Sequence, residues 1–371
     1  MSYTIQTLWY NRKQYLPPTC AVAFSALLVA LQCGMLLGTF AIVSIPIDHT
    51  PRADLWIGCR DVISVDISRP IPRLWRARLR MPEIERSEVY YQGFGFWRKG
   101  SGAVELAIVI GSQLGPESLG AVDRLTREHR HRLAEAGTVV VDRADLKRLG
   151  IDGVGAVTEV NGRRIRVVGL VEGLKGLSGP YLFCSLETAR DLLGMATSQT
   201  TYLLARCRPG LSPIEVRRQL DRYGDMSVFT RTEFSNRSRL HWLFNTGGGL
   251  ALLAAAVLGL LVGALITTQT LYAAAAASMK EYAVLRAMGI SRQRIASTVI
   301  TQAIVVGLLG IILAGSLVGP LAALIQYQGA NVQLPSWMLL SSGVLTFAMA
   351  MLSGVLALRS IRLSDPVALL R

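Results

Sequence analysis

The chain has 371 residues, of which 51% are hydrophobic, and its formal net charge is +14. A mean hydropathy of +0.38 is high for a soluble protein, so the composition indicates a membrane protein. The basic balance would also suit a nucleic-acid-binding protein, but basic segments beside membrane spans and a mildly basic surface facing anionic lipid headgroups explain it better.

Four long segments without a charged residue are predicted to be transmembrane helices. They are Thr19–Ile45, Leu243–Ala277, Ala296–Pro335 and Ser336–Leu358. Each exceeds the roughly 20 apolar residues that cross a bilayer. The first is too long for the core of a cleaved signal peptide, which has about 7–15 residues. Pro17 and Pro18 precede it and are expected to break any continuous helix from the N-terminus.

Basic residues in the short segments between the spans predict the orientation. The N-terminal segment, the loop after the second span and the C-terminal tail contain arginine, whereas residues 327–335 contain neither lysine nor arginine. Both termini are therefore expected in the cytoplasm. The predicted order is a cytoplasmic N-terminal segment at 1–18, transmembrane helix 1 at 19–45, an extracytoplasmic α+β domain at 46–242, transmembrane helix 2 with a stalk at 243–277, a cytoplasmic coupling helix at 278–295, transmembrane helix 3 at 296–326, an external loop at 327–335, transmembrane helix 4 at 336–358 and a cytoplasmic tail at 359–371.

The extracytoplasmic segment alternates between strand and helix patterns. Strands are predicted at 55–57, 62–65, 104–110, 138–141, 181–184, 201–206 and 226–230, and helices at 121–136, 143–149, 186–193 and after Ser212-Pro213. Serine before the first turn and proline within it are typical of a helix start. The alternation predicts two small α+β lobes.

The strongest local signal in this domain is a β-hairpin. Val154–Val160 and Arg163–Val171 are alternating runs, and Asn161-Gly162 lies between them. Asn-Gly suits a type I′ turn because both residues tolerate positive φ. We therefore expect two antiparallel strands here.

Cysteine usage decides little. Cys59, Cys184 and Cys207 lie in the extracytoplasmic segment, and Cys20 and Cys33 lie in the first span. Three external cysteines allow at most one internal disulfide, and their spacing selects no pair. Three free buried thiols fit the sequence equally well.

Motifs for catalysis are absent from the sequence. It contains no GxxxxGK[ST], HExxH or GxSxG, so we expect no phosphate-binding loop, zinc-protease site or serine-hydrolase site. His129 and His131 would point to different faces of a helix and are interpreted as surface residues. No charged residue interrupts a span, which argues against a proton relay. We expect the chain to bind no cofactor or metal.

The second span is longer than a bilayer requires. Residues 243–277 would form a helix of about 52 Å at 1.5 Å per residue. Together with the long first span, it could act as a lever joined to the external domain; strong tilt or a frayed start at Gly247–Gly249 would also explain the length. Two pairs at close-packing spacing, Gly259 with Gly263 and Gly315 with Gly319, indicate helix packing within the chain or, alternatively, a dimer seam.

Ala277–Arg294 is a short amphipathic segment between two apolar spans. It carries Lys280, Arg286, Arg292 and Arg294, and a cytosolic protein could bind it. Since the chain has no phosphate-binding loop, energy must come from such a partner.

Three stretches resemble the FtsX/MacB family of ABC transporter permeases. They are Glu281–Gly289, which resembles the family's coupling-helix signature, the tail with Asp365-Pro366, and Leu149–Val171 with its Asn-Gly hairpin. Ala23–Leu28, Leu31–Gly34 and Phe94–Arg98 resemble the DevC group of exporter permeases, which includes the heterocyst glycolipid exporter. Gly153–Ala156 departs from the Val-Gly-Asp that the family often has, so the external loop does not map residue by residue.

The resemblance implies a multi-pass protein of the bacterial inner membrane, working as two permeases with two cytoplasmic ABC ATPases that use ATP and Mg²⁺. The ATPase would dock on residues 278–294 and on the segment around Trp9–Lys13. The candidate contacts are Lys280, Glu281, Leu285, Arg286, Met288 and Gly289. A solvated Glu281–Arg286 pair is the alternative reading. Motion of the coupling helices would reach the external domain through the first two spans, which the family calls mechanotransmission.

Three functions follow from this reading. The chain could be an export permease for a lipidic or hydrophobic cargo, with a periplasmic adaptor and an outer-membrane channel as in the DevC group. It could instead be an FtsX-like signalling scaffold that transports nothing and activates a periplasmic cell-wall hydrolase. A membrane-anchored receptor or enzyme is disfavoured by the coupling segment.

Overall fold

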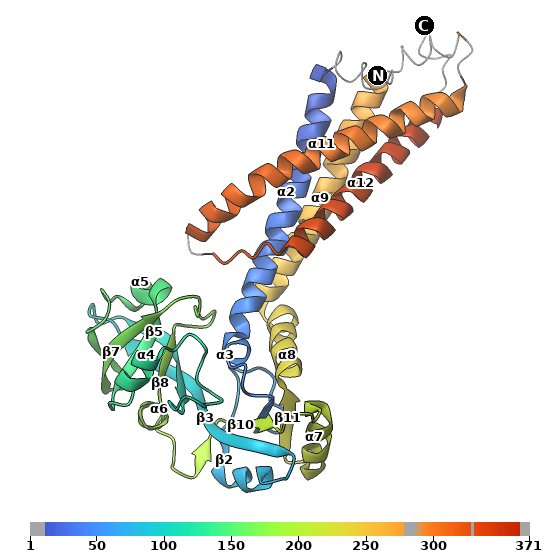
Figure 1. The fold of residues 1–371 in the computed structure, drawn as a ribbon. Helices are drawn as coiled ribbons and strands as arrows, with labels where there is room; N and C mark the ends of the chain where they lie inside the picture. The colour runs from blue at the N-terminus through green and yellow to red at the C-terminus, as the bar shows by residue number, and fades with distance from the viewer. Residues whose placement is uncertain (1–11, 278–287, 289–290, 328–329, 364–371) are drawn as a thin grey trace. The chain divides into compact units, whose positions relative to one another are not determined.

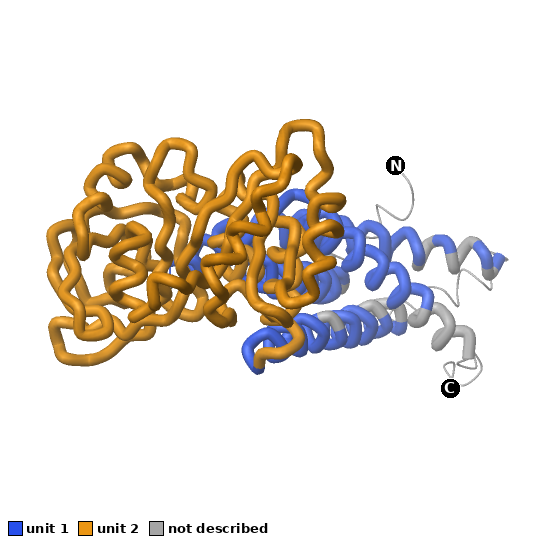
Figure 2. Tube along the Cα trace, turned by 90° about the horizontal axis from the view of Figure 1, so that it is seen from below, with its two compact units in different colours: residues 1–39, 247–371 blue, residues 40–246 orange. Residues whose placement is uncertain are grey.

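The computed structural model describes residues 12–277, 288, 291–327 and 330–363. The chain divides into two compact units (Figure 2). The first comprises residues 1–39 and 247–371, and the second comprises residues 40–246. The second unit is thus an insertion after the first membrane helix.

The first unit is built from long helices (Figure 1). They are α2 (Arg12–Val43), α9 (Gly247–Ala277), α11 (Arg292–Tyr327) and α12 (Ser336–Leu363). Each contains a stretch long and apolar enough to cross a membrane: Tyr15–Val43, Gly247–Thr270, Ile300–Tyr327 and Ser336–Val355. The prediction of four transmembrane helices with a large mixed α/β domain after the first is confirmed.

The expected helix break at Pro17 and Pro18 is wrong. Helix α2 spans Arg12–Val43 and includes both prolines. Each proline removes one backbone donor, but its fixed φ near −65° is a helical value. In a membrane segment the helix is the conformation that satisfies the remaining backbone groups, so the two missing bonds are tolerated.

The second unit contains one large sheet. Its strands are β1 (Leu55–Cys59), β3 (Ile84–Arg98), β4 (Val104–Ser112), β5 (Thr138–Asp142), β6 (Val157–Val160), β7 (Arg163–Val171), β8 (Tyr181–Ser185), β10 (Tyr202–Cys207) and β11 (Met226–Thr230), with a small separate pair, β2 (Ile71–Pro72) and β9 (Gln199–Thr200). The order is β11-β1-β10-β3-β4-β8-β5-β7-β6, and β3 also pairs with β6. The second half of the sheet therefore closes on itself through β3.

Strand β3 belongs to both halves of the sheet. Residues 84–90 pair with β10, and residues 91–98 pair with β4. The helices around the sheet are short: α3 (Ile45–Asp48), η1 (Arg73–Leu79), α4 (Arg127–Arg132), η2 (Arg143–Asp145), α5 (Leu146–Leu149), α6 (Leu186–Leu193), α7 (Pro213–Leu220), η3 (Asp221–Tyr223) and the longer α8 (Arg231–Phe244). A single continuous strand thus joins the two parts of the external unit.

The Asn-Gly hairpin is confirmed. Asn161 has φ 50° and Gly162 has φ 76°, as a type I′ turn requires. Val160 pairs with Arg163 in the antiparallel register of β6 and β7. The first strand begins at Val157 rather than Val154, after two glycines with positive φ at 153 and 155.

Two external predictions are wrong. The helix expected at 121–136 is confined to α4, because Ala121, Val122 and Leu125 are buried in the core and the Thr126 side chain caps a helix that starts only at Arg127. The expected strand at 62–65 is absent from the described chain, which has only an isolated bridge between Ser64 and Ile67 there.

The helix of the second span, α9, starts later than predicted. Leu243 belongs to α8, which ends at Phe244, and α9 begins at Gly247. Thr230 and Glu233 form a capping box that starts α8, so this segment is a separate helix of the external unit. Helix α9 still has 31 residues, or about 46 Å of helix, which exceeds the roughly 30 Å of hydrocarbon.

Candidate coupling and helix-packing sites

The predicted coupling segment lies almost entirely outside the described residues. Lys280, Glu281, Leu285, Arg286 and Gly289 are among those not described. Met288 is described and is 69% exposed. Its side chain is therefore open to solvent, and the roles of all six residues stay predictions.

Two of the four predicted packing glycines lie at the contact of α9 with α2. A Cβ on Gly259 would lie 2.1 Å from Leu28 Cδ2, and one on Gly263 would lie 2.9 Å from Ser25 Cβ. The Ser25 hydroxyl lies 3.2 Å from the Gly263 carbonyl oxygen, to which it can donate, and 3.4 Å from Thr267 Oγ1. Close backbone approach and a hydroxyl contact therefore join these two helices.

The other two packing glycines contact nothing in the described chain. A Cβ added to Gly315 or Gly319 would meet no described atom within 4 Å. On the same helix, α11, a Cβ on Gly310 would lie 2.7 Å from Val22 of α2. Helix α11 thus packs on α2 around Gly310 and leaves the Gly315–Gly319 face open.

A third glycine pair holds the loop between α11 and α12 against α2. A Cβ on Gly38 would lie 2.2 Å from the Asn331 carbonyl oxygen, and one on Gly34 would lie 2.8 Å from Leu334 Cδ2. The backbone N–H of Gln333 donates to the Gly34 carbonyl at 3.0 Å. Gly34 and Gly38 have the same Gly-xxx-Gly spacing as the two predicted pairs, so this contact has a signal in the sequence.

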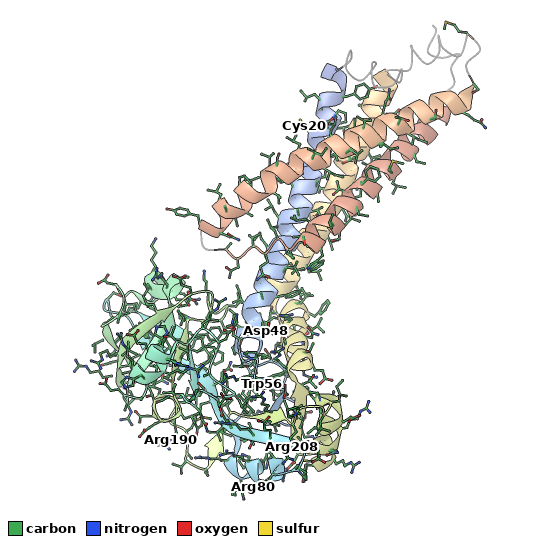
Figure 3. All side chains as sticks on the ribbon, in the orientation of Figure 1. Cys20, Asp48, Trp56, Arg80, Arg190 and Arg208 are labelled. Carbon is green, nitrogen blue, oxygen red and sulfur yellow. The ribbon has the colours of Figure 1, made fainter. Side chains whose placement is uncertain are left out.

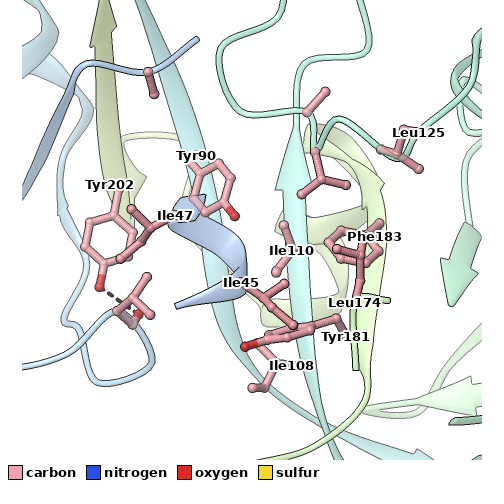
Figure 4. Close-up of a cluster of buried hydrophobic side chains, with 14 of the residues drawn as sticks. Ile45, Ile47, Tyr90, Ile108, Ile110, Leu125, Leu174, Tyr181, Phe183 and Tyr202 are labelled. Atoms are coloured by element: carbon pink, nitrogen blue, oxygen red, sulfur yellow. Dashed lines mark hydrogen bonds between the residues drawn. The ribbon is translucent and has the colours of Figure 1, made fainter. Parts of the chain in front are cut away.

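The short helix α3 inserts two apolar side chains into the core of the external unit. Ile45 and Ile47 are 6% and 0% exposed and pack in one cluster with Trp56, Tyr90 and Phe234. Figure 4 shows Ile45 and Ile47 between Tyr90 and Tyr202 on one side and Ile108, Ile110 and Tyr181 on the other. The segment that follows α2 in the chain is therefore anchored inside the sheet's core.

Asp48, labelled in Figure 3, joins α3 to α8. Its Oδ2 accepts from the Ser44 hydroxyl at 2.6 Å and from Arg239 Nη2 at 2.6 Å, and its Oδ1 accepts from the Ser235 hydroxyl at 2.9 Å. Arg239 Nε also donates to Ser44 Oγ at 2.9 Å. We call these four residues the Asp48 clamp. No sequence signal connects Asp48 with Arg239, because they are far apart in the chain.

The Asp48 clamp should contribute measurable coupling energy. In a double-mutant cycle, Asp48→Asn and Arg239→Gln are expected to show a coupling free energy of about 1 kcal/mol, a modest value because the two side chains are 35% and 34% exposed. Unfolding of the purified full chain in urea measures it. The pair of Arg60 and Asp61, 75% and 92% exposed, is the control and should show no coupling. Equal coupling in both cycles would rule out a special role for the clamp.

No candidate catalytic or metal-binding site is evident among the described residues. They include no group of three or more His, Cys, Asp or Glu side chains that could hold a metal. The five cysteines are all free thiols, and burial raises the pKa of Cys207 to about 11. What the described structure offers instead is helix packing and the anchoring of α3 and α8.

Comparison with known proteins places the membrane part of the chain. Residues 253–366 match the family model described as FtsX-like permease C-terminal. The periplasmic region of MacB from Actinobacillus actinomycetemcomitans is similar to 51% of this chain over 94% of its own length, with 15% identity and a TM-score of 0.36. The extracellular domain of the noncanonic ABC-type transporter YknZ from Gram-positive bacteria is similar to 48% of this chain over 98% of its length, with 12% identity and a TM-score of 0.32. No curated protein gave a significant match.

The chain thus combines four helices that could cross a membrane, a large domain inserted after the first, and a match to the FtsX-like permease C-terminal model that covers the last three. Over residues 253–366 the chain therefore resembles FtsX-like permeases.

Proposed function

We propose that this chain is the permease subunit of an export complex in which a separate ATPase drives movement of the extracytoplasmic domain. The cargo is lipidic or hydrophobic, and a periplasmic adaptor and an outer-membrane channel complete the export route, as in the DevC group. Both termini and residues 278–295 face the cytoplasm. The absence of charged residues from the predicted spans supports cargo handling outside the membrane core rather than through a polar pore.

The membrane helices are the first elements through which movement of the ATPase would reach the extracytoplasmic domain. The ATPase docks on the segment between α9 and α11, so its closure acts on both helices. The tight approach of α9 to α2 at Gly259 and Gly263 favours movement of these two helices together. ATP favours the closed arrangement because it binds that arrangement more tightly than the open one.

The observation that carries the proposal is the anchoring of α3 and α8. Helix α3 follows α2 in the chain, and α8 precedes α9. The Asp48 clamp links α3 to α8, and Ile47 and Phe234 bury both elements in one core. A displacement that enters through either chain segment would therefore act on the whole sheet, since a packed core resists local deformation.

The proposal is tested by reversing one charge in the coupling segment. Glu281→Lys is expected to keep the protein in the membrane but to uncouple ATP hydrolysis from export, because the new charge opposes the ATPase contact. Export of labelled lipid and hydrolysis by the reconstituted complex are measured together. Glu172→Lys, on an exposed side chain of the external unit, is the matched charge reversal. Unchanged export in Glu281→Lys would remove this residue from the interface.

The same complex distinguishes export from signalling. If export is the function, hydrophobic cargo should stimulate ATP hydrolysis and leave the membrane in an ATP-dependent manner. Stimulation by a cell-wall hydrolase, with no movement of lipid, would favour the FtsX-like signalling role instead. In both cases the coupling segment and the Asp48 clamp would transmit movement from the ATPase to the extracytoplasmic domain.

A further inference from the structure

Asp66 is a buried carboxyl group in the loop that follows β1. It is 8% exposed. Its Oδ1 accepts a hydrogen bond from Gln92 Nε2 on β3 at 3.0 Å. This contact joins the loop to the strand that both parts of the sheet share. A buried carboxylate without a cationic partner is costly, so the protonation state of Asp66 matters for the fold.

The oxygen atom of the Gln92 side-chain amide, Oε1, needs a hydrogen-bond donor. Gln92 Oε1 is buried and has no hydrogen-bond partner in the described part of the chain. An ionised Asp66 carries no proton to give it, whereas a protonated Asp66 has one. A carboxylic acid and an amide can then form two parallel hydrogen bonds, from Nε2 to Oδ1 and from the acid hydroxyl to Oε1. Burial raises the pKa of Asp66 to about 7, against the opposing effect of the Gln92 hydrogen bond.

Three tyrosines around Asp66 stay neutral. Burial raises the pKa of the hydroxyl groups of Tyr90 on β3, Tyr181 on β8 and Tyr202 on β10, and the charge of Asp66 raises each pKa further. Tyr202 donates to the Val65 carbonyl at 2.8 Å (dashed in Figure 4). Near neutral pH, Asp66 is therefore the one of these four residues whose charge changes, while Asp145, which also acts on Tyr181, has its pKa raised by burial to about 6.

The loop that carries Asp66 is fastened to α8. The Val65 backbone N–H donates to Ser238 Oγ at 3.0 Å, and Arg237 Nε donates to the Val62 carbonyl at 3.0 Å. Both partners lie on the helix that precedes α9 in the chain. A change in how firmly the loop is held on β3 would thus reach α8 through these two hydrogen bonds.

We propose that Asp66 and Gln92 form a proton-dependent lock between the loop at residues 62–66 and β3. At low pH the protonated acid makes two hydrogen bonds and holds the loop on the sheet. At higher pH the ionised acid loses one of them and adds a buried charge, which loosens the loop and its contacts with Ser238 and Arg237. External pH would in this way adjust the stiffness of the segment before α9. The lock does not depend on the proposed export function.

The direction of the pH effect follows from proton linkage. The pKa of Asp66 rises from its ordinary 3.8 in the unfolded chain to about 7 in the folded protein. Its contribution to stability is therefore complete below about pH 4 and is lost as the pH rises to about 7. Over that range the folding equilibrium constant should fall by up to about three orders of magnitude from this group alone.

The test compares the full-length protein with Asp66→Asn, whose amide can make both hydrogen bonds at any pH. Asp66→Asn should match the wild type near pH 4.5 and be much more stable near pH 8, with a flatter stability profile. Hydrogen-exchange protection of residues 62–68 and 231–244 should fall with pH only in the wild type. Infrared spectra should show a protonated carboxyl band in the wild type that the variant lacks.

Asp152→Asn, at an exposed position, removes the same charge without touching the lock and should keep the wild-type profile. Parallel stability profiles for the wild type and Asp66→Asn would overturn the proposal. So would an infrared spectrum in which Asp66 is ionised throughout the range from about pH 5 to pH 8.

Discussion

Replacing Gly38 with valine is expected to detach the loop at residues 330–335 from α2 and to destabilise the membrane unit by about 3 kcal/mol. The added Cβ would lie 2.2 Å from the carbonyl oxygen and 2.6 Å from the carbonyl carbon of Asn331. These are backbone atoms, so the clash cannot be relieved by a side-chain rotation. The loop or the helix must move instead. Unfolding of the purified chain in mixed detergent micelles, with sodium dodecyl sulfate as denaturant, measures the loss.

Gly315→Val is the matched control for this substitution. It places the same side chain on a membrane helix where no described atom lies within 4 Å of the new Cβ. The stability of the isolated chain should change by less than about 1 kcal/mol. If Gly315 lies at a dimer seam, the variant would lower the dimer fraction while leaving that stability unchanged. Equal destabilisation by both variants would contradict the contact between Gly38 and Asn331.

The membrane helices and the hairpin are readable from the sequence because their causes are local. An uncharged apolar segment must form a helix in lipid wherever it stands in the chain. Asn161-Gly162 sets its own turn through two residues that accept positive φ, here 50° and 76°. Neither inference needs a distant partner, and the structure confirms both.

Strand β3, in contrast, is hidden by its own composition. Its first half contains Glu85, Arg86 and Glu88, which do not suggest a central strand. Glu88 is nevertheless 1% exposed, because it accepts from the Ser118 hydroxyl and the Leu119 backbone N–H and pairs with Arg86. Such long-range partners cannot be identified from one sequence, so the strand that joins the two parts of the sheet was missed.

The predictions of helices differ from the structure in two ways: one helix is shorter than predicted, and another was not predicted. The pattern at 121–136 looks helical, but three apolar side chains at its start are needed in the core, and tertiary packing overrides the local preference. Helix α8 was missed although Thr230 and Glu233 have the spacing of a capping box. That signal was readable, and it would have separated α8 from the predicted stalk.

The residues of the candidate site also fall into two groups: those that the sequence indicates and those that only the folded structure reveals. Resemblance predicts the coupling segment, which lies almost entirely outside the described residues, and glycine spacing pointed to the contact between α9 and α2. The Asp48 clamp and the burial of Ile47 required the folded structure, because α3 and α8 lie at opposite ends of the inserted domain in the chain. Anchoring of this kind depends on which surfaces meet, and a four-residue helix carries no sequence signal of it.

Ile47→Ala is expected to cost about 2–5 kcal/mol of unfolding free energy, because Ile47 is 0% exposed and its truncation leaves a cavity in the core. The cavity lies where α3 enters the sheet, so the variant should also weaken transmission from α2. In the reconstituted complex, ATP hydrolysis should continue while export falls. Chemical unfolding followed by tryptophan fluorescence gives the stability, since Trp56 lies in the same cluster.

Ile63→Ala is the control for this loss, since Ile63 is 44% exposed and should cost less than about 0.5 kcal/mol. General destabilisation is separated from lost anchoring by Val140→Ala, which truncates a buried residue of β5 in the same cluster as Ile47. If α3 anchors the motion, Ile47→Ala should reduce export more than Val140→Ala does at equal loss of stability. An equal reduction would mean that export depends on the stability of the sheet as a whole, and α3 would then be a structural element without a part in transmission.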